Sequence, residues 1–577
     1  MNRLFAGLTI VVGCAAVVPA QAPATRAVVD LLPPTTVLYA ELTDPAALLS
    51  IVVDHPLRAK IEALPPYQQA IQTPQYKQML QGRDRFETVV GMPWRQAIET
   101  FTANGVTLAV DGASRGVAVI VQGKDAATMK TFRDKFVAFA SMGNNANKLQ
   151  SVDYRGIAAH RLDEARFALF ENQLLITNNS DLGKAILDRM IDGNGESLKQ
   201  NERFQSAQRT RSSDATAWAF VDVQTIRNAG VADAVYNDQI NNPVLELLLG
   251  GIQSGLKETP FATANLTAST EQLALQLAMP YDIAWVPEQR EYFFGPDGLG
   301  RGPAIASVNP TLFTLSTHRD FAQMWLRAGD LFNEQINDGF AKADATLTTL
   351  FAGADFGEDI LGSVEPEVGF VATRQDFADR LPRPTIKLPA FGIVMTMKEP
   401  ETMTRDLRRT FQSMIGFFNV VGAMNGQNQL EMDMEKLSDD AQLVTSNYVP
   451  EDDDRESTDA PILFNFSPTV GFSGDRFVVA STTDLARQLT LAKPPSPAQI
   501  DDNTAANLRA DTLQQILDDN REQLIAQNML EDGNSREEAQ AAIDLLLQVV
   551  GYFRDASIRL SQPSDQLELE FNVRIGE

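Results

Sequence analysis

The sequence predicts an α+β fold made of two tandem copies of a mixed antiparallel-sheet and helix domain. Residues 171–187 read ENQLLITNNSDLGKAIL, and residues 474–490 read GDRFVVASTTDLARQLT. In each stretch a polar turn leads into a short apolar run, which is typical of a buried strand. Asp-Leu then opens a helix whose apolar residues recur at a spacing of four, on one face. Strand and helix patterns alternate along the rest of the chain, which favours the same fold class.

The helix in each stretch has a predicted start. Ser180 and Thr483 are the expected N-caps, because a hydroxyl oxygen can accept a hydrogen bond from a free helix N–H group. Asp181 and Asp484 follow in the first turn, where the helix dipole favours negative charge. These features explain both stretches without a ligand, so we expect them to be structural.

The first copy is expected over residues 23–282. VLYAEL at 37–42 is a predicted strand, and Asp44-Pro45 is a predicted helix start with proline at the first helical position. Two apolar runs within 105–123 are bounded by glycine and predict a hairpin. Residues 261–281 predict a second hairpin that closes the copy.

The second copy is expected over residues 303–577. It follows residues 283–302, which end in GPDGLGRG and are interpreted as a linker. PTLFTLS at 310–316 corresponds to VLYAEL, the first predicted strand of the first copy. The closing hairpin also recurs, because Leu567 and its neighbours repeat the alternation found at Leu273.

An acidic segment at 427–460 is interpreted as a loop insertion in the second copy. It includes four consecutive carboxylates, Glu451-Asp452-Asp453-Asp454. Calcium prefers oxygen ligands of this kind, but the ligand spacing of an EF-hand is absent. We therefore expect a solvated acidic loop, with calcium binding as an alternative.

The composition limits the classes of function. The chain has 577 residues, with 49 basic and 75 acidic residues and a net charge of −26. Such a surface repels nucleic-acid phosphates, so no nucleic-acid partner is expected. Three histidines and one cysteine make a zinc site unexpected. No cofactor and no metal site is predicted.

The N-terminus predicts export. Arg3 precedes an apolar run over residues 4–18, and AQA at 20–22 is a small-x-small cleavage site, so residues 1–22 are interpreted as a signal peptide. The alternative is a lipid anchor on Cys14, because the residues before it loosely resemble a lipoprotein cleavage box. No later segment is long and apolar enough to predict a membrane span. We expect a protein of the periplasm or cell envelope.

One motif could carry catalysis. Residues 112–116 (GASRG) match the G-x-S-x-G elbow that exposes a serine nucleophile between a strand and a helix. Here the motif joins two predicted strands, so we expect a hairpin turn in which glycines supply positive φ. A serine hydrolase that uses Ser114, with His160 or His318 as base, is the weaker alternative.

The chain also resembles a family. The opening LLPPTTVLYAEL at 31–42, after a signal peptide, and FVVASTTDLARQL at 477–489 are similar to the DUF3352-like bacterial exported proteins. That family has no established activity. The resemblance therefore implies an exported protein and assigns no functional residue.

These observations favour a noncatalytic interaction or scaffold module whose partner is an unknown protein. No residue is assigned a catalytic, cofactor-binding or metal-binding role. The alternative is a carrier of an apolar small molecule or lipid, held in a cleft between helices and sheet. That alternative is suggested by the 31 phenylalanines and 16 methionines and by the amphipathic helices.

Overall fold

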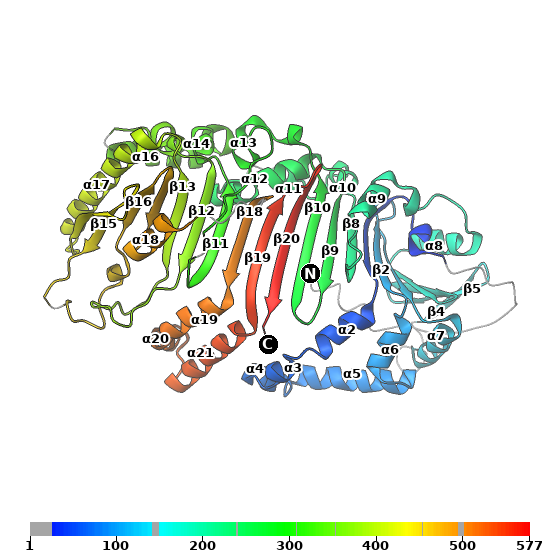
Figure 1. Cartoon of the computed structure of the whole chain (residues 1–577). Coiled ribbons are helices and arrows are strands. Elements are labelled where there is room, and N and C mark those ends of the chain that lie inside the picture. The colour runs from blue at the N-terminus through cyan, green and yellow to red at the C-terminus, as the bar shows by residue number, and fades with distance from the viewer. Residues whose placement is uncertain are drawn as a thin grey trace. The chain divides into compact units, whose positions relative to one another are not determined.

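The computed structural model describes residues 26–140, 149–237, 240–306, 308–351, 353–452, 454–493 and 501–576. The expected signal peptide over residues 1–22, including Cys14, lies outside these residues. Helices and antiparallel strands make up the described chain, which confirms the predicted α+β class (Figure 1).

The chain divides into two compact units. The described part of the first unit covers residues 26–233 and 259–280, and the second unit covers 234–258 and 281–576. The division differs from a boundary at residue 282, because residues 234–258 belong to the second unit. Helix α12 (Pro243–Glu258) precedes the last hairpin of the first unit in sequence but belongs to the second unit.

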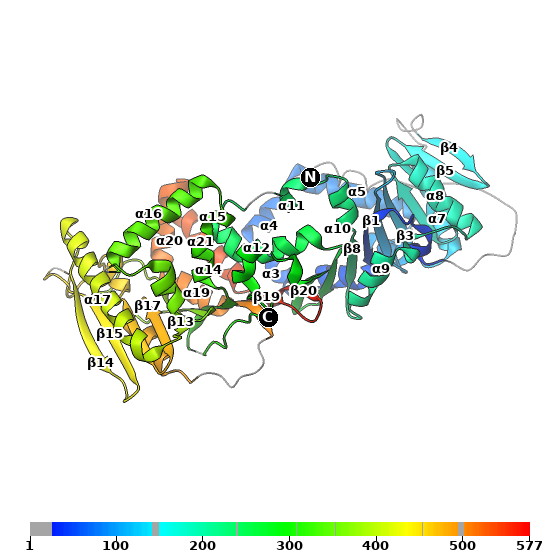
Figure 2. The same ribbon diagram turned by 90° about the horizontal axis from the view of Figure 1, so that it is seen from above.

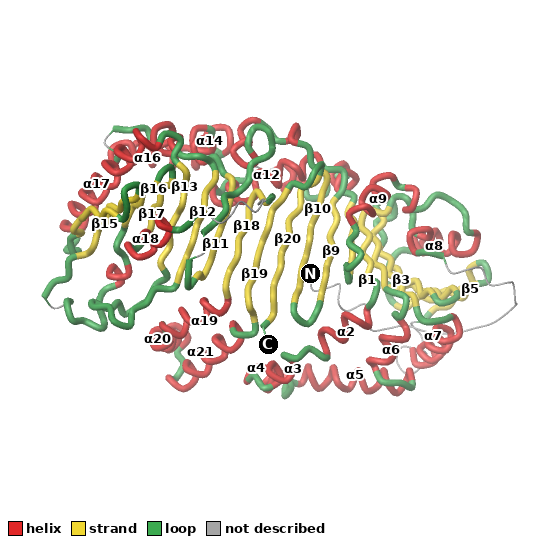
Figure 3. The backbone as a smooth tube through the Cα atoms, in the orientation of Figure 1, coloured by secondary structure: helices red, strands yellow, loops and turns green. Residues whose placement is uncertain are grey.

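The first unit contains one antiparallel sheet with the strand order β4-β5-β6-β7-β3-β2-β1-β8-β9-β10. Its strands lie side by side in Figure 3. The strands are β1 (Thr36–Leu42), β2 (Val106–Asp111), β3 (Val117–Gln122), β4 (Gln150–Tyr154), β5 (Ile157–Leu162), β6 (Ala165–Phe170), β7 (Gln173–Thr177), β8 (Ala217–Val221), β9 (Ala262–Ala268) and β10 (Gln272–Pro280).

The helices of the first unit are mostly connections between these strands. They are α1 (Val28–Leu31), α2 (Pro45–Val53), α3 (Arg58–Glu62), α4 (Pro65–Ala70), α5 (Pro74–Val90), α6 (Trp94–Phe101), α7 (Ala126–Ala140), α8 (Ser180–Asp192), α9 (Glu202–Ala207) and α10 (Val223–Asn228). A short helix, α11 (Asp233–Asn237), spans the division between the units.

The second unit repeats the strand order of the first, element for element. Its order is β14-β15-β16-β17-β13-β12-β11-β18-β19-β20. The shared order supports the tandem organisation that the sequence predicts. The strands are β11 (Thr311–His318), β12 (Glu367–Thr373), β13 (Ala390–Thr396), β14 (Leu430–Lys436), β15 (Ala441–Tyr448), β16 (Thr469–Ser473), β17 (Arg476–Ala480), β18 (Asp502–Arg509), β19 (Phe553–Ser561) and β20 (Gln566–Ile575).

The helices of the second unit follow the same plan, with longer excursions. Besides α12 they are α13 (Glu291–Phe294), α14 (Phe321–Leu326), α15 (Ala328–Leu331), α16 (Glu334–Leu350), α17 (Pro400–Met424), α18 (Thr483–Leu491), α19 (Ala510–Asp519), α20 (Arg521–Asp532) and α21 (Arg536–Val550). A single π-helical turn occupies Phe356–Ile360. A capping box starts α21, because the Ser535 hydroxyl and the Glu538 carboxylate each accept a hydrogen bond from the other residue's backbone N–H.

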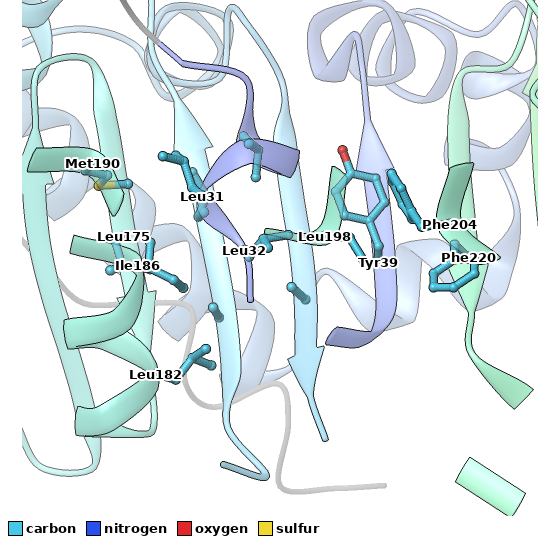
Figure 4. Packing of buried hydrophobic residues seen from close by; sticks show 14 of the residues in the cluster. Leu31, Leu32, Tyr39, Leu175, Leu182, Ile186, Met190, Leu198, Phe204 and Phe220 are labelled. Carbon is cyan, nitrogen blue, oxygen red and sulfur yellow. The ribbon is translucent and has the colours of Figure 1, made fainter. Parts of the chain in front are cut away.

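Strands β4–β7 of the first unit lie between two helices (Figure 1). On one face, Leu175 packs against Leu182, Ile186 and Met190, which line one side of α8 (Figure 4). On the other face, Phe167 packs against Phe136 of α7. The same layering recurs in the second unit, where α18 and α17 cover opposite faces of β15–β17. Because side chains alternate along a strand, each face has its own set of residues.

Two predicted connections are wrong. Residues 427–460 are not a loop insertion, because most of them form the hairpin β14–β15, which occupies the place of β4–β5 in the shared strand order. Residues 283–302 are not a simple linker. They contain two short 3-10 turns and α13, whose Tyr292, Phe293 and Phe294 are fully buried.

The predicted caps of α8 and α18 are each displaced by one residue. Asn179 caps α8 by accepting hydrogen bonds from the backbone N–H groups of Asp181 and Leu182. Thr482 caps α18 by accepting one from Leu485. Ser180 and Thr483 are instead the first residues of their helices. The expected cap of α2 at Asp44 is confirmed, with proline at the following position.

Candidate functional site

Ser114 lies in the turn between β2 and β3, as the sequence predicts. Its hydroxyl donates a hydrogen bond to Asp111, and its oxygen accepts one from the backbone N–H of Gly116 at 3.2 Å. The positive φ of this turn is at Arg115 (54°), and not at the glycines as expected. Gly116 is needed for space instead, because an added Cβ would lie 2.7 Å from the Asn179 Cβ.

None of the three histidines, all of which are described, forms a hydrogen bond with Ser114. The His160 ring bonds the Ser151 hydroxyl through Nδ1 at 2.8 Å and stacks on Phe167. His55 bonds the Thr270 carbonyl oxygen at 2.8 Å. His318 belongs to the second unit, where its Nδ1 lies 3.5 Å from Glu367. The described contacts therefore do not pair Ser114 with the histidine base that the hydrolase alternative requires, and the partner of its hydroxyl is Asp111.

The acidic hairpin does not gather a metal site among the described residues. No group of three His, Cys, Asp or Glu side chains in the described ranges could hold a metal ion. Glu435 of β14 instead pairs with Arg487 of α18, with Oε2 and Nη2 2.7 Å apart. Asp439 in the turn pairs with Lys436.

The core of the second unit contains a buried ion pair. Arg290 donates to both carboxylate oxygens of Glu246, at 2.6 and 2.9 Å, and to the Ser254 hydroxyl at 3.3 Å. The Tyr292 hydroxyl donates to the Glu246 backbone oxygen at 2.8 Å. Burial, followed by the nearby Glu246 carboxylate, raises the pKa of Tyr292.

A second buried arginine extends this cluster. Arg319 donates through Nη1 to the Asn503 Oδ1 at 2.7 Å and through Nε to the Leu247 oxygen at 2.8 Å. Its guanidinium also lies over the Phe293 ring, 3.5 Å from the centroid. Burial lowers the pKa of Arg319 to about 9, which is still above neutral pH, so the guanidinium stays protonated there. These bonds join α12, α13, β18 and the residue that follows β11, so the cluster is structural.

A cavity of about 310 Å³ lies in the first unit, between α8 and the sheet strands β4–β7. This volume is at the lower end of the range of roughly 300–1,000 Å³ that is typical of small-molecule sites. Its walls come from five elements. They include Gln150, Val152 and Tyr154 of β4, Ala159 and Arg161 of β5, Arg166 and Ala168 of β6, Leu175 and Thr177 of β7, and Ser180, Gly183, Lys184 and Leu187 of α8.

The sheet wall of the cavity consists of two parallel rows of side chains. The apolar row runs across the strands as Val152, Ala159, Ala168 and Leu175, each paired with the next in register. Two of these four residues are alanines, so the sheet leaves space beneath α8. His160 and Phe167 alternate with this row and point to the α7 face.

The polar row lies two residues further along each strand. It contains Gln150, Arg161, Arg166 and Thr177, again in register. Lys184 of α8 lines the same cavity and is exposed. None of the described residues that line the cavity is acidic, in a chain whose net charge is −26.

Sequence reasoning predicted a cleft between helices and sheet but assigned none of these residues to it. The signal is weak, because small side chains such as Ala159 and Ala168 are equally common in tightly packed cores. A wider cavity of about 630 Å³ lies in the second unit beside the β14–β15 turn. It includes several carboxylates, among them Asp439 and Asp440, together with Lys436.

Comparison with known proteins assigns no family. No protein-family model matches the chain. No curated protein matches it. Two crystal forms of TP0453 give partial structural matches, at 10% and 11% sequence identity and TM-scores of 0.25 and 0.24, over 44% of this chain and 79% of theirs. A likeness at this level carries no conclusion about fold or function. Within the described ranges, no helix has the length and apolar character to cross a bilayer.

Proposed function

We propose that this chain is a noncatalytic exported protein of the periplasm or cell envelope whose first unit carries a small apolar ligand. The cavity between α8 and strands β4–β7 is the observation that supports ligand carriage. The N-terminal sequence and the resemblance to the DUF3352-like proteins support export. The engagement of Ser114 with Asp111 supports the noncatalytic part of the proposal.

The ligand would bind against the apolar row of the sheet wall. Leu175 is buried, and Ala168 is 3% exposed, whereas Val152 at the outer strand is 65% exposed. A ligand that covers Val152 and fills the space above the alanines removes apolar surface from water. Such burial stabilises by about 25 cal/mol per Å². The cavity thus supplies a hydrophobic driving force without any specific polar contact.

The test is calorimetric titration of the full chain with 1-decanol, a neutral apolar probe. We expect saturable binding that is lost in Ala159→Leu, because the larger side chain occupies the cavity. Ala126→Leu is the matched control, since it adds the same bulk at an exposed position of α7. Absence of saturable binding, or equal binding to Ala159→Leu and the native chain, would contradict the proposal.

An interaction module is the second candidate, and one surface favours it. The C-terminal end of α17 exposes a group of large apolar side chains: Phe417, Phe418, Val420, Val421 and Met424. The sequence from 410 to 430 contains no charged residue. This end of the helix lies beside β14 (Figure 2). Apolar groups of this size on a surface often mark contact sites.

A photoreactive cross-linker placed at Val420 tests this second candidate in cells. We expect one dominant cross-linked species that a linker at the exposed Leu530 of α20 does not capture. Equal patterns from both positions would argue against a contact site on α17.

A further inference from the structure

We infer that the ligand of the first unit is an amphipathic anion, with its apolar chain in the cavity and its carboxylate or phosphate head at Lys184, Arg161 and Arg166. This inference rests on the proposed carrier function and specifies the chemical class of its ligand.

Charge is the first argument. The chain has 26 more acidic than basic residues, yet three basic side chains and no acidic one line the cavity within the described residues. Basic side chains at the cavity of an acidic protein attract an anion locally, while the rest of the surface repels it. A neutral lipid or sterol would gain nothing from this arrangement.

The placement of the charges is the second argument. Arg161 and Arg166 are direct cross-strand neighbours in the polar row. That row lies two residues along the strands from the apolar row, a distance of about 7 Å. Both guanidinium groups are held in place, because Arg166 donates to the Asn178 carbonyl oxygen at 2.7 Å and Arg161 to that of Asp163 at 3.0 Å. An anionic head can thus reach the polar row while its chain covers the apolar row.

The second unit provides an internal comparison. Through the shared strand order, Ala159 is equivalent to Leu443, which faces Gly471 as Ala159 faces Ala168. Leu443 is fully buried. Thr490 of α18 lies so close to Gly471 that an added Cβ would be 2.0 Å from its hydroxyl oxygen. Larger side chains and a close helix therefore fill the space that stays open in the first unit.

The units also differ in the charges between the helix and the outer strand of the sheet. Arg487 of α18 pairs with Glu435 of β14. The equivalent residues of the first unit are Lys184 and Val152, so the carboxylate is missing and the cation is kept. Among the described residues, Lys184 has one ionic partner, the exposed Asp181, at 3.9 Å. The ammonium group is therefore placed to pair with an anion that the ligand brings.

The experiment compares three probes with the same chain length on the full chain at pH 8: decanoate, decyl phosphate and 1-decanol. We expect both anions to bind at least tenfold more tightly than the alcohol, and their advantage to fall as salt is added. The order of the two anions identifies the head group, and either order supports the inference.

Two variants test the contribution of the ligand's head group separately from that of its apolar chain. Lys184→Gln and Arg161→Gln change exposed side chains, and we expect each to weaken anion binding severalfold while 1-decanol binding stays within twofold. Lys130→Gln, an exposed lysine of α7, is the matched control. Equal affinities for anions and alcohol, or no effect of either variant on the anions, overturn the inference while the carrier function stands. If none of the three probes binds, the proposed function itself fails.

A graft from the second unit completes the test. The triple variant Val152→Glu, Ala159→Leu, Lys184→Arg copies the filled arrangement onto the first unit. We expect it to lose all three probes and to keep the native circular dichroism spectrum. Retained anion binding by this folded variant would place the ligand elsewhere and overturn the inference.

Discussion

Arg290 and Glu246 form a two-pronged ion pair whose side chains are 8% and 0% exposed. The two residues are separated by 44 positions in the sequence, and the chain between them includes the last hairpin of the first unit. The pair therefore holds α12 in the second unit, although the last hairpin of the first unit lies between α12 and the rest of the second unit in the sequence.

Removing one partner of this pair should strongly destabilise the second unit. Glu246→Ala leaves Arg290 buried without its carboxylate, and we expect a loss of about 3–5 kcal/mol in the free energy of unfolding. Urea unfolding followed by circular dichroism measures it. Glu62→Ala is the control, because the Arg58–Glu62 pair is exposed and such pairs contribute about 0–1 kcal/mol. Equal losses in both variants would refute the structural role assigned to the buried pair.

Opening a cavity in the second unit should also be costly. Leu443→Ala removes a fully buried side chain that fills the space beneath α18. We expect a loss of about 2–5 kcal/mol, since the surroundings relax only partly. The same urea experiment applies, with Leu530→Ala as control, because Leu530 is 86% exposed and its loss should cost about 0.5 kcal/mol or less. A loss of that small size for Leu443→Ala would show that α18 does not pack closely there.

His160 should make stability depend on pH. Burial, together with the charge of Arg133, lowers the pKa of His160. The folded state thus disfavours the protonated ring, so stability is greatest above the unfolded pKa of about 6.5 and falls as the pH drops from there towards the lowered folded value. We expect the native chain to lose more stability between pH 7.5 and 5.5 than His160→Gln does, as measured by thermal unfolding. Parallel curves for the two proteins would contradict this role.

Calcium should not stabilise the β14–β15 hairpin. Its carboxylates belong to strands or to ion pairs, such as Glu435 with Arg487, and the described residues gather no group of metal ligands. We therefore expect the same melting temperature in millimolar calcium as in a chelator, measured by scanning calorimetry. A rise with calcium that Asp439→Asn abolishes would restore the calcium alternative.

The sequence predicted the fold class and the repeated strand–helix unit because their signals are local. The apolar runs at Leu174 and Phe477, and the helices after them, depend on periodicity and caps within a few residues. The tandem-copy prediction also gains support from the strand order. The caps of α8 and α18 each lie one residue before the predicted position, because two neighbouring polar residues could serve and only the backbone geometry decides between them.

Most of the features that the sequence mispredicted or missed depend on contacts between residues that are far apart in the sequence. The segment 283–302 has the composition of a linker, but Arg290 is held by Glu246 across the intervening hairpin. The hairpin at 430–448 was missed although Leu430, Met432 and Met434 of β14 alternate with charged residues, which is the pattern of a half-exposed strand. The cavity follows from Ala159 and Ala168 meeting across strands, and no local pattern specifies that meeting.

The position of α12 has a consequence for how this chain can be divided or inherited. Between residues 26 and 576 the backbone passes from one unit to the other three times, after residues 233, 258 and 280. A single cut, by a protease or by a recombination breakpoint, therefore cannot release one intact unit. A gene fragment that begins at residue 281 would encode Arg290 without Glu246, so the second unit can be transferred whole only if α12 travels with it.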